Sequence, residues 1–139
     1  MAANHTIEMY ITASSATDIY YLIRKHLHNI EAAKMIMGKL YSLTGILEVT
    51  ADDCMDALAS AISDYEDAVV EKVASRKDMD YIVTRNIKDY QAGGTKIILP
   101  DDFVKLVERG INFLPQNTSN TDFVKLLLCS ILCLIAVDS

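Results

Sequence analysis

Short apolar runs alternate along the chain with longer segments in which apolar residues recur at the spacing of one helix face. The apolar runs predict strands at 8–12, 46–49, 81–84 and 96–99. The amphipathic segments predict one helix from about Ser15 through Ile23, and others over about 29–42, 50–62, 63–76 and 101–110. Strands separated by helices pair in parallel through crossover connections. We therefore predict an α/β domain whose parallel central sheet is flanked by helices on both faces.

Polar residues mark the starts of several predicted helices. Ser15-Ala-Thr-Asp18, Thr50-Ala-Asp-Asp53 and Ser63-Asp-Tyr-Glu66 all have the spacing of a capping box. A carboxylate in the first turn of a helix also complements the helix dipole. Asp18, and Asp67 near the start of its helix, therefore have a structural interpretation as well as any functional one.

Residues 111–139 depart from the alternating pattern. Residues 112–120 resemble a loop, and the 15 residues of 123–137 are apolar apart from Lys125 and Ser130. A membrane-spanning helix needs about 20 such residues, so we do not expect membrane association. We predict a domain over 1–110 and an apolar tail over 111–139 that packs on it as a buried helix or strand.

Composition narrows the class of protein. A chain of 139 residues with 51% hydrophobic residues fits one globular domain. Its net charge of -6 argues against nucleic-acid binding by bulk electrostatics, but permits a nucleic-acid enzyme whose acidic site is neutralised by metal. The three cysteines form no even framework, and the first residues lack a signal-peptide pattern. We therefore expect reduced thiols and a cytoplasmic protein.

Acidic and amide side chains occur where α/β proteins place ligand sites. Asn86 and Asp89 follow the predicted strand 81–84, and Asp18 and Asp67 lie near the starts of two helices. Carboxylates from separate elements suit Mg²⁺ or Mn²⁺, which can activate water for phosphodiester hydrolysis without a His or Cys nucleophile. Turns also favour Asn and Asp, so a structural role for Asn86 and Asp89 stays open.

Three segments, 11–21, 64–68 and 82–90, resemble the PIN-domain family in order, spacing and context, within a similarity that extends over 7–108. The resemblance implies a three-layer sandwich and a metal-dependent ribonuclease, of which many are VapC-like toxins of toxin–antitoxin pairs. It places Asp18, Asp67 and Asp89 at the second, third and fourth acidic positions, as catalytic residues and as ligands of Mg²⁺ or Mn²⁺.

The same resemblance implies the partners and the substrate contacts. We expect an RNA substrate, an antitoxin protein and a homodimer. Asn86 is expected to orient water or hold a phosphate oxygen, while Thr84 and Ser15 bind the scissile phosphate. Arg85 and Lys88 flank the site and are expected to contact RNA phosphates.

The chain also departs from the family pattern. PIN domains begin with a central strand that ends in Asp, followed by a helix, before the strand seen here at 8–12. The chain therefore resembles a truncated or permuted member. In the permuted interpretation, Leu132–Val137 fills the central position and Asp138 supplies the missing metal ligand. In the alternative, the tail is unrelated and covers the gap as a helix, and the chain is a catalytically inactive binding module.

Overall fold

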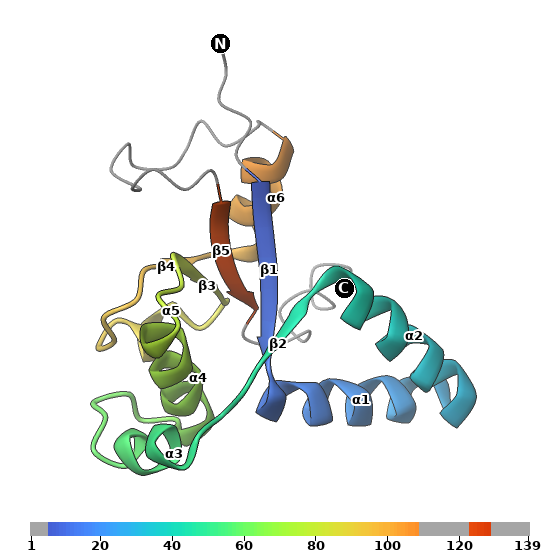
Figure 1. The fold of residues 1–139 in the computed structure, drawn as a ribbon, viewed down its shortest axis with the longest axis horizontal. Helices are drawn as coiled ribbons and strands as arrows, with labels where there is room; N and C mark the ends of the chain where they lie inside the picture. Colours follow the sequence, from blue (N-terminus) through green and yellow to red (C-terminus); the bar gives the residue numbers. More distant parts are fainter. Residues whose placement is uncertain (1–5, 109–122, 129–139) are drawn as a thin grey trace.

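The fold was obtained as a computed structural model, which describes residues 6–108 and 123–128 (Figure 1). The strands are β1 (Thr6–Thr12), β2 (Gly45–Leu47), β3 (Tyr81–Val83), β4 (Ile97–Ile98) and β5 (Phe123–Leu128). The helices are α1 (Ala13–Leu27), α2 (Ile30–Leu43), α3 (Ala51–Ala57), α4 (Tyr65–Arg76), α5 (Ile87–Tyr90) and α6 (Pro100–Glu108). Within the described ranges, no helix is long and apolar enough to cross a membrane.

The five strands form one sheet in the order β2-β1-β5-β3-β4, and every pairing is parallel. β5 lies at the centre, where Leu127 is in register with Tyr10 of β1 on one side and Ile82 of β3 on the other. Parallel strands bury both faces, which is why β5 is almost continuously apolar. The predicted parallel sheet is confirmed.

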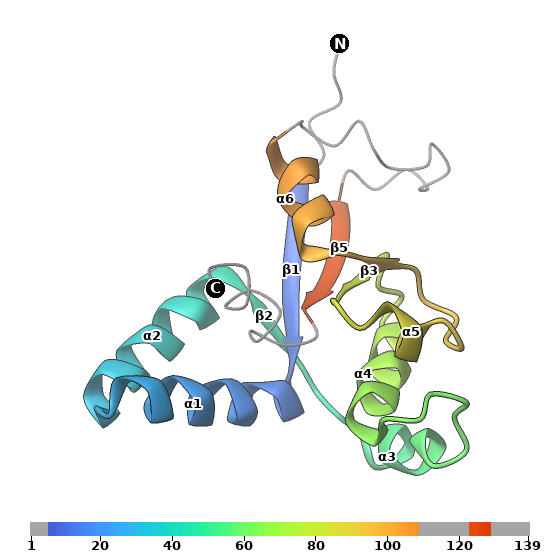
Figure 2. The ribbon, with the colours of Figure 1, turned by 180° about the vertical axis from the view of Figure 1, so that it is seen from behind.

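Alternate residues of the central strands point into two separate cores. Ile82 and Leu127 pack with α3 and α4 on one face, whereas Val83, Leu126 and Leu128 pack with α1 and α2 on the other. Figures 1 and 2 show α1 and α2 extending to one side of the sheet, with α3 and α4 on the opposite side. The prediction of helices on both faces is also confirmed.

The position of the tail strand corrects the sequence interpretation. The place between β1 and β3 is filled by β5, so the prediction that Leu132–Val137 fills it is wrong. The predicted helical covering is also wrong for 123–128, which is a strand. Periodicity cannot separate a buried strand from a buried helix in an unbroken apolar run, and it cannot set the register within that run. Asp138 lies outside the described residues.

Asp80 anchors β5 from the loop before β3. Its backbone N–H donates to the Lys125 carbonyl oxygen at 2.9 Å, and its carboxylate accepts from the Lys125 N–H at 2.8 Å. Both backbone polar groups of Lys125 are therefore paired at the point where β5 enters the sheet. This contact joins residues 45 positions apart and pins the register of the central strand.

Two helices begin at different residues from those predicted. α1 starts at Ala13, because Thr12 at the end of β1 is its N-cap and the Thr12 Oγ1 accepts from the Ser15 N–H at 3.1 Å. The predicted capping box of Ser15 and Asp18 is therefore wrong. α4 is capped by Asp64 rather than Ser63, with the Asp64 Oδ1 accepting from the Asp67 N–H at 3.0 Å. Overlapping Ser, Thr and Asp residues make such caps ambiguous in sequence.

Other elements differ in extent. α3 ends at Ala57, not near Ile62, and a turn region connects it to α4. The short helix α5 occupies a segment expected to be a polar turn. Thr50 caps α3 as predicted, in a reciprocal capping box with Asp53. A salt bridge then joins the buried Asp53 to Arg76 at the end of α4, whose side chain is 30% exposed, with Nη2 at 2.9 Å from Oδ2.

We expect the salt bridge between Asp53 and Arg76 to make the stability of the fold sensitive to acid. Burial alone would raise the pKa of Asp53, but hydrogen bonds from Arg76 and Thr50 outweigh it and lower the pKa. A carboxyl with a lowered folded-state pKa stabilises the fold above its unfolded pKa of about 4, and loses that contribution as pH falls through the folded value. We expect Asp53→Asn to cost about 1–2 kcal/mol at pH 7 and to flatten the acid limb of a urea-unfolding series. An unchanged acid limb would contradict this.

Candidate active site

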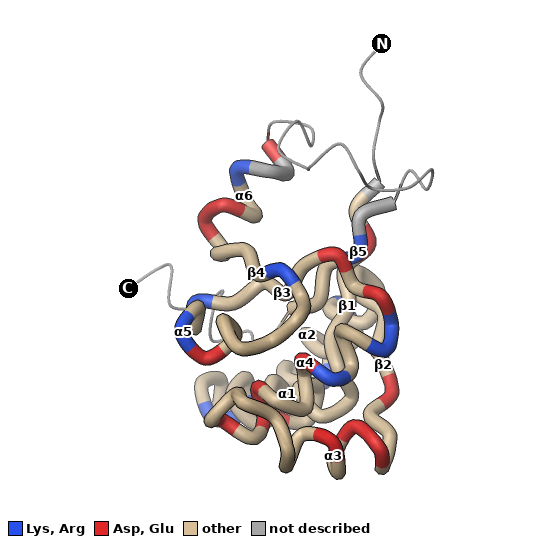
Figure 3. Tube along the Cα trace, turned by 90° about the vertical axis from the view of Figure 1, so that its left-hand side faces the viewer, with Lys and Arg blue, Asp and Glu red and all other residues tan. Residues whose placement is uncertain are grey.

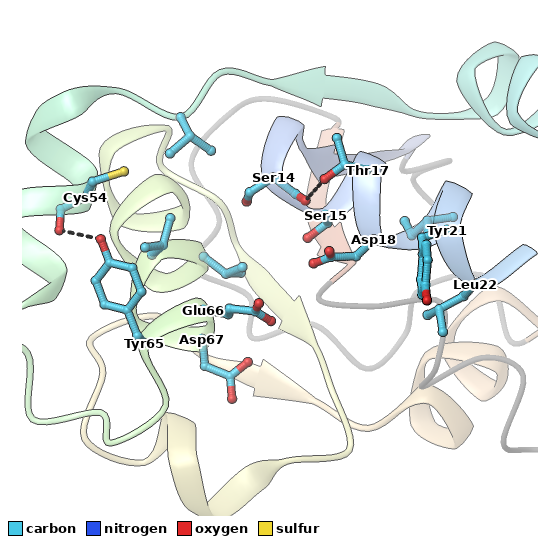
Figure 4. Close-up of a pocket in the computed structure, with 14 residues that line it drawn as sticks. Ser14, Ser15, Thr17, Asp18, Tyr21, Leu22, Cys54, Tyr65, Glu66 and Asp67 are labelled. Atoms are coloured by element: carbon cyan, nitrogen blue, oxygen red, sulfur yellow. Dashed lines mark hydrogen bonds between the residues drawn. The ribbon is translucent and has the colours of Figure 1, made fainter. Parts of the chain in front are cut away.

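A cleft of about 550 Å³ opens between the start of α1 and the start of α4. α1 follows β1 directly, and Asn86, just beyond β3, contacts Asp67 on α4. The cleft therefore lies beside the carboxyl ends of the central strands, the usual ligand position in open α/β sheets. Figure 4 shows Asp18 projecting from α1, and Glu66 and Asp67 from α4, into this space.

Neither helix capping nor a contact with another described residue explains why Asp18 is acidic. It lies in the second turn of α1, and the first turn contains no acidic residue. Its side chain is exposed and lines the cleft, and it has no hydrogen-bond or ion-pair partner among the described residues. The capping explanation considered for Asp18 therefore fails, which favours a role in the cleft.

Asp67 is held from two directions. The Tyr90 hydroxyl donates to its Oδ1 at 3.0 Å, and the Asn86 amide Nδ2 donates to its Oδ2 at 3.2 Å. Tyr90 is only 2% exposed, so this support comes from a packed side chain. Asp67 is half-buried, and both of its carboxylate oxygens have a fixed orientation at the edge of the cleft.

Asn86 also joins the second acid of this group. Its Nδ2 donates to the Asp89 Oδ2 in addition to Asp67, so one amide group bridges two carboxylates. Asn86 stands at the N-cap position of α5, but its side chain makes no capping hydrogen bond there. The side chain is therefore directed to the two acids, and the turn explanation considered for Asn86 does not describe its contacts.

A second contact ties α5 to α4. One turn after Asp67, the Glu71 Oε1 accepts from the Gly94 N–H at 3.1 Å, and Gly93 donates to the Tyr90 carbonyl oxygen at 2.9 Å. Glu71 is 6% exposed, and a Cβ at Gly93 would lie 2.9 Å from its Cγ. The turn after α5 thus packs tightly against α4, which positions Tyr90 and Asp89.

The donor set fits a hard divalent cation. Two carboxylates that share one amide donor repel each other, and a cation beside them would relieve that repulsion. Mg²⁺ and Mn²⁺ commonly use one or two protein carboxylates and complete their coordination with water and phosphate. No group of three His, Cys, Asp or Glu side chains within the described residues is close enough to hold an ion alone. Water or substrate oxygens would have to supply the remaining ligands.

The other predicted substrate-binding residues are in different surroundings. Ser15 is buried at the cleft wall, where the Thr12 hydroxyl donates to its Oγ at 2.8 Å. Thr84 is 1% exposed, and its hydroxyl accepts from the Asn86 N–H at 3.0 Å, outside the lining of the cleft. Arg85 is exposed on the same turn. The structure therefore brings Asp18, Asp67 and Ser15 to one cleft, with Asn86 and Asp89 attached through Asp67.

Sequence reasoning missed Tyr90 and Glu66. Tyr90 follows Asp89 directly, but nothing in the local pattern shows that its hydroxyl reaches a residue 23 positions away. Glu66 was considered only as part of a helix cap, whereas it lines the cleft beside Asp67. Local sequence patterns could not have indicated either role, because the Tyr90 contact depends on how α4 and α5 pack, and the place of Glu66 depends on how α1 and α4 lie around the cleft.

The family model for the PIN domain matches residues 1–88. The match covers more than half of the chain, including Asp18, Asp67 and Asn86, and ends one residue before Asp89. The chain belongs to the PIN-domain family. Membership of the PIN-domain family implies nuclease-type activity and nucleic-acid binding in general. Neither the curated proteins nor the solved structures gave a significant match.

The shared amide of Asn86 gives a test of this site. Replacing Asn86 with Ala removes the donor that orients both Asp67 and Asp89, so we expect Mg²⁺ or Mn²⁺ to bind about 10- to 100-fold more weakly. Isothermal titration calorimetry with Mn²⁺ measures this directly. Asn29→Ala, which removes only the N-cap of α2, is the matched control and should leave the metal affinity unchanged. Equal affinities of Asn86→Ala and the parent chain would contradict the assignment.

Proposed function

We propose that this PIN-domain protein is a Mg²⁺- or Mn²⁺-dependent ribonuclease. The observation that carries the proposal is the Asn86 amide bridging Asp67 and Asp89 beside a cleft that Asp18 also lines. Two acidic side chains from α4 and α5 are thereby joined near the carboxyl ends of the central strands, and a third, from α1, lines the same cleft as Asp67. Such a site suits hydrolysis of a phosphodiester, whose oxygens complete the coordination of a hard cation.

Each residue has a defined part in this proposal. Asp67 and Asp89 would hold the cation, and Asp18 would reach it directly or through water. When bound, the cation supplies an activated water and stabilises the leaving oxygen. Asn86 and the Tyr90 hydroxyl keep the ligand oxygens oriented, so that little reorganisation is needed on binding. Ser15 and Arg85 remain proposed contacts to substrate phosphates, whereas the expected contact from Thr84 is not proposed, because its side chain is buried outside the lining of the cleft.

Cleavage of RNA by the full chain tests the proposal. The purified chain should degrade an unstructured RNA in Mg²⁺ or Mn²⁺ and stop when EDTA is added. The measurement follows fluorescent RNA by denaturing gel, with Asp67→Asn prepared in parallel to exclude a contaminating ribonuclease. Cleavage that persists in EDTA, or that is equal in Asp67→Asn, would overturn the assignment.

A second candidate is a non-catalytic binding module, which exposed apolar residues on α2 favour. Ile30, Met35 and Leu43 are 48%, 64% and 68% exposed. In this proposal these exposed apolar side chains of α2 contact a second copy of the chain or an antitoxin-like protein in the cytoplasm. Sedimentation at micromolar concentration tests it: a dimer that lacks nuclease activity supports the module, and a monomer counts against it.

A further inference from the structure

The helix that carries Asp89 is too short to hold itself in place. α5 is four residues long, and its N-cap side chain makes no capping hydrogen bond. A single helical turn has little stability of its own, because the cost of nucleation is not repaid by further turns. Figures 1 and 2 show α5 beside α4, and Figure 3 shows acidic residues on both. The position of Asp89 relative to Asp67 therefore depends on the contacts that attach α5 to α4.

Two of these contacts end on Asp67 itself. The Tyr90 hydroxyl donates to one of its carboxylate oxygens, and the Asn86 amide donates to the other. A contact that ends on a metal ligand moves when that ligand side chain moves. The two contacts therefore join the acids to each other, but they do not fix α5 relative to the body of α4.

Glu71 provides an attachment that is separate from the acids of the site. It lies four residues after Asp67, so both side chains project from the same face of α4. The Glu71 Oε1 accepts from the Gly94 N–H at 3.1 Å. A Cβ at Gly93 would lie 2.9 Å from the Glu71 Cγ and 3.1 Å from its Cδ, closer than a normal contact. A hydrogen bond and close packing thus hold the turn after α5 against this one side chain.

Stability alone does not explain an acid at this position. Glu71 is buried, yet its Oε2 has no hydrogen-bond partner among the described residues. Burying an oxygen without a partner costs free energy. Val70 and Ala74, also buried on α4, show that apolar side chains pack on this helix. Proteins tolerate such local costs chiefly at functional sites.

We propose that Glu71 is a positioning residue of the metal site. Through the Gly94 N–H it fixes the turn after α5, and that turn sets the places of Tyr90 and Asp89. Glu71 itself does not contact the cation. This inference rests on the proposed function, because it concerns the cation that Asp67 and Asp89 would hold.

Titration of the full chain with Mn²⁺ in a calorimeter, without RNA, tests the role of Glu71. We expect Glu71→Ala to weaken Mn²⁺ binding about 10-fold, the lower end of the range for residues that orient metal ligands, because Glu71 acts through a further contact. Glu71→Gln keeps an oxygen that can accept from the Gly94 N–H, so it should retain most of the affinity. Parent affinity in Glu71→Ala, or an equal loss in Glu71→Gln, would overturn the proposal.

Gly93 allows the same contact to be tested from the other side. Gly93→Ala places a methyl group against Glu71 and should push the turn away from α4, which weakens Mn²⁺ binding. In Glu71→Ala the methyl group has room, since the next atom near it is the Tyr90 carbonyl oxygen at 3.3 Å. The double variant should therefore bind Mn²⁺ no more weakly than Glu71→Ala alone. Losses that multiply would show that the two residues act independently, against the proposal.

Two control variants lie on α2, away from α4 and α5. Met37 is buried in the core on the other face of the sheet, so Met37→Ala should melt at a lower temperature without losing Mn²⁺ affinity. A Cβ at Gly38 meets no atom within 4 Å, so Gly38→Ala should bind Mn²⁺ like the parent. Thermal melting checks that every variant is folded. If Met37→Ala loses as much affinity as Glu71→Ala, the effect is a general loss of stability and the positioning role is wrong.

The positioning role and the ribonuclease function fail in different ways. A chain that cleaves RNA while Glu71→Ala binds Mn²⁺ like the parent keeps the ribonuclease function and loses the positioning role. A chain that never cleaves RNA, but in which Glu71→Ala and Gly93→Ala weaken Mn²⁺ binding, keeps the positioning role and loses the ribonuclease function. A parent chain that binds no Mn²⁺ overturns both.

Discussion

Asp67→Asn should reduce metal-dependent RNA cleavage by at least about 100-fold while leaving the chain folded. Loss of a residue that merely supports a metal ligand typically costs 10- to 100-fold, so loss of a ligand charge should reach or exceed the upper end of that range. The isosteric amide can still accept from the Tyr90 hydroxyl, and it removes one charge from a crowded acidic group. Thermal stability should therefore hold or rise. Initial cleavage rates and melting curves measure the two effects.

Asp56→Asn is the matched control for this substitution. Asp56 is exposed on α3 and does not line the cleft. Its replacement by Asn removes the same charge from the protein as Asp67→Asn does. The Asp56→Asn variant should cleave RNA at the parent rate. If Asp56→Asn and Asp67→Asn lose activity equally, the effect comes from net charge and the metal-ligand role of Asp67 is wrong.

Leu127→Ala should cost about 2–5 kcal/mol of unfolding free energy, the largest single-residue effect on stability that we expect. Leu127 is fully buried in β5, paired with β1 on one side and β3 on the other, and packs in the core beneath α3 and α4. A cavity at this position cannot close without moving the central strand of the sheet. Urea unfolding monitored by circular dichroism measures the loss.

Leu58→Ala makes the same chemical change at a leucine that is 79% exposed, so it should alter the unfolding free energy by less than about 0.5 kcal/mol. Removing residues 123–139 should abolish cooperative unfolding altogether, because it leaves β1 and β3 without their shared neighbour. A truncated chain that unfolds cooperatively at the parent midpoint would show that β5 is dispensable.

Local pattern was sufficient for most elements of the fold. The alternation of apolar runs and helical periodicity predicted the α/β class and the parallel sheet, since both depend on which side chains each element must bury. The Thr50 cap of α3 followed from residues only three positions apart. Local pattern did not identify the start of a helix that has several candidate caps. At the start of α1, Thr12 competes with Ser15, and only the direct passage of β1 into α1 selects Thr12.

The acidic site was also predicted in part from local sequence and decided in part by tertiary packing. The sequence indicated Asp18, Asp67, Asn86 and Asp89 by motif, and the family membership that those motifs suggested is established by the PIN-domain match. It could not separate a cap from a ligand, because both use a carboxylate near a helix start. The bridge from Asn86 to Asp67, across 19 residues, and the Tyr90 hydroxyl contact exist only after α4 and α5 pack together.

The central strand is where tertiary structure decided most. The sequence by itself determined that 123–137 is apolar enough to be buried, because that requires only its composition. The entry of 123–128 into the sheet was decided by contacts with distant segments: Asp80 pairs both backbone groups of Lys125, and β1 and β3 each need a parallel neighbour. A uniformly apolar run satisfies burial in any register, so only hydrogen-bonding partners elsewhere in the chain can choose one.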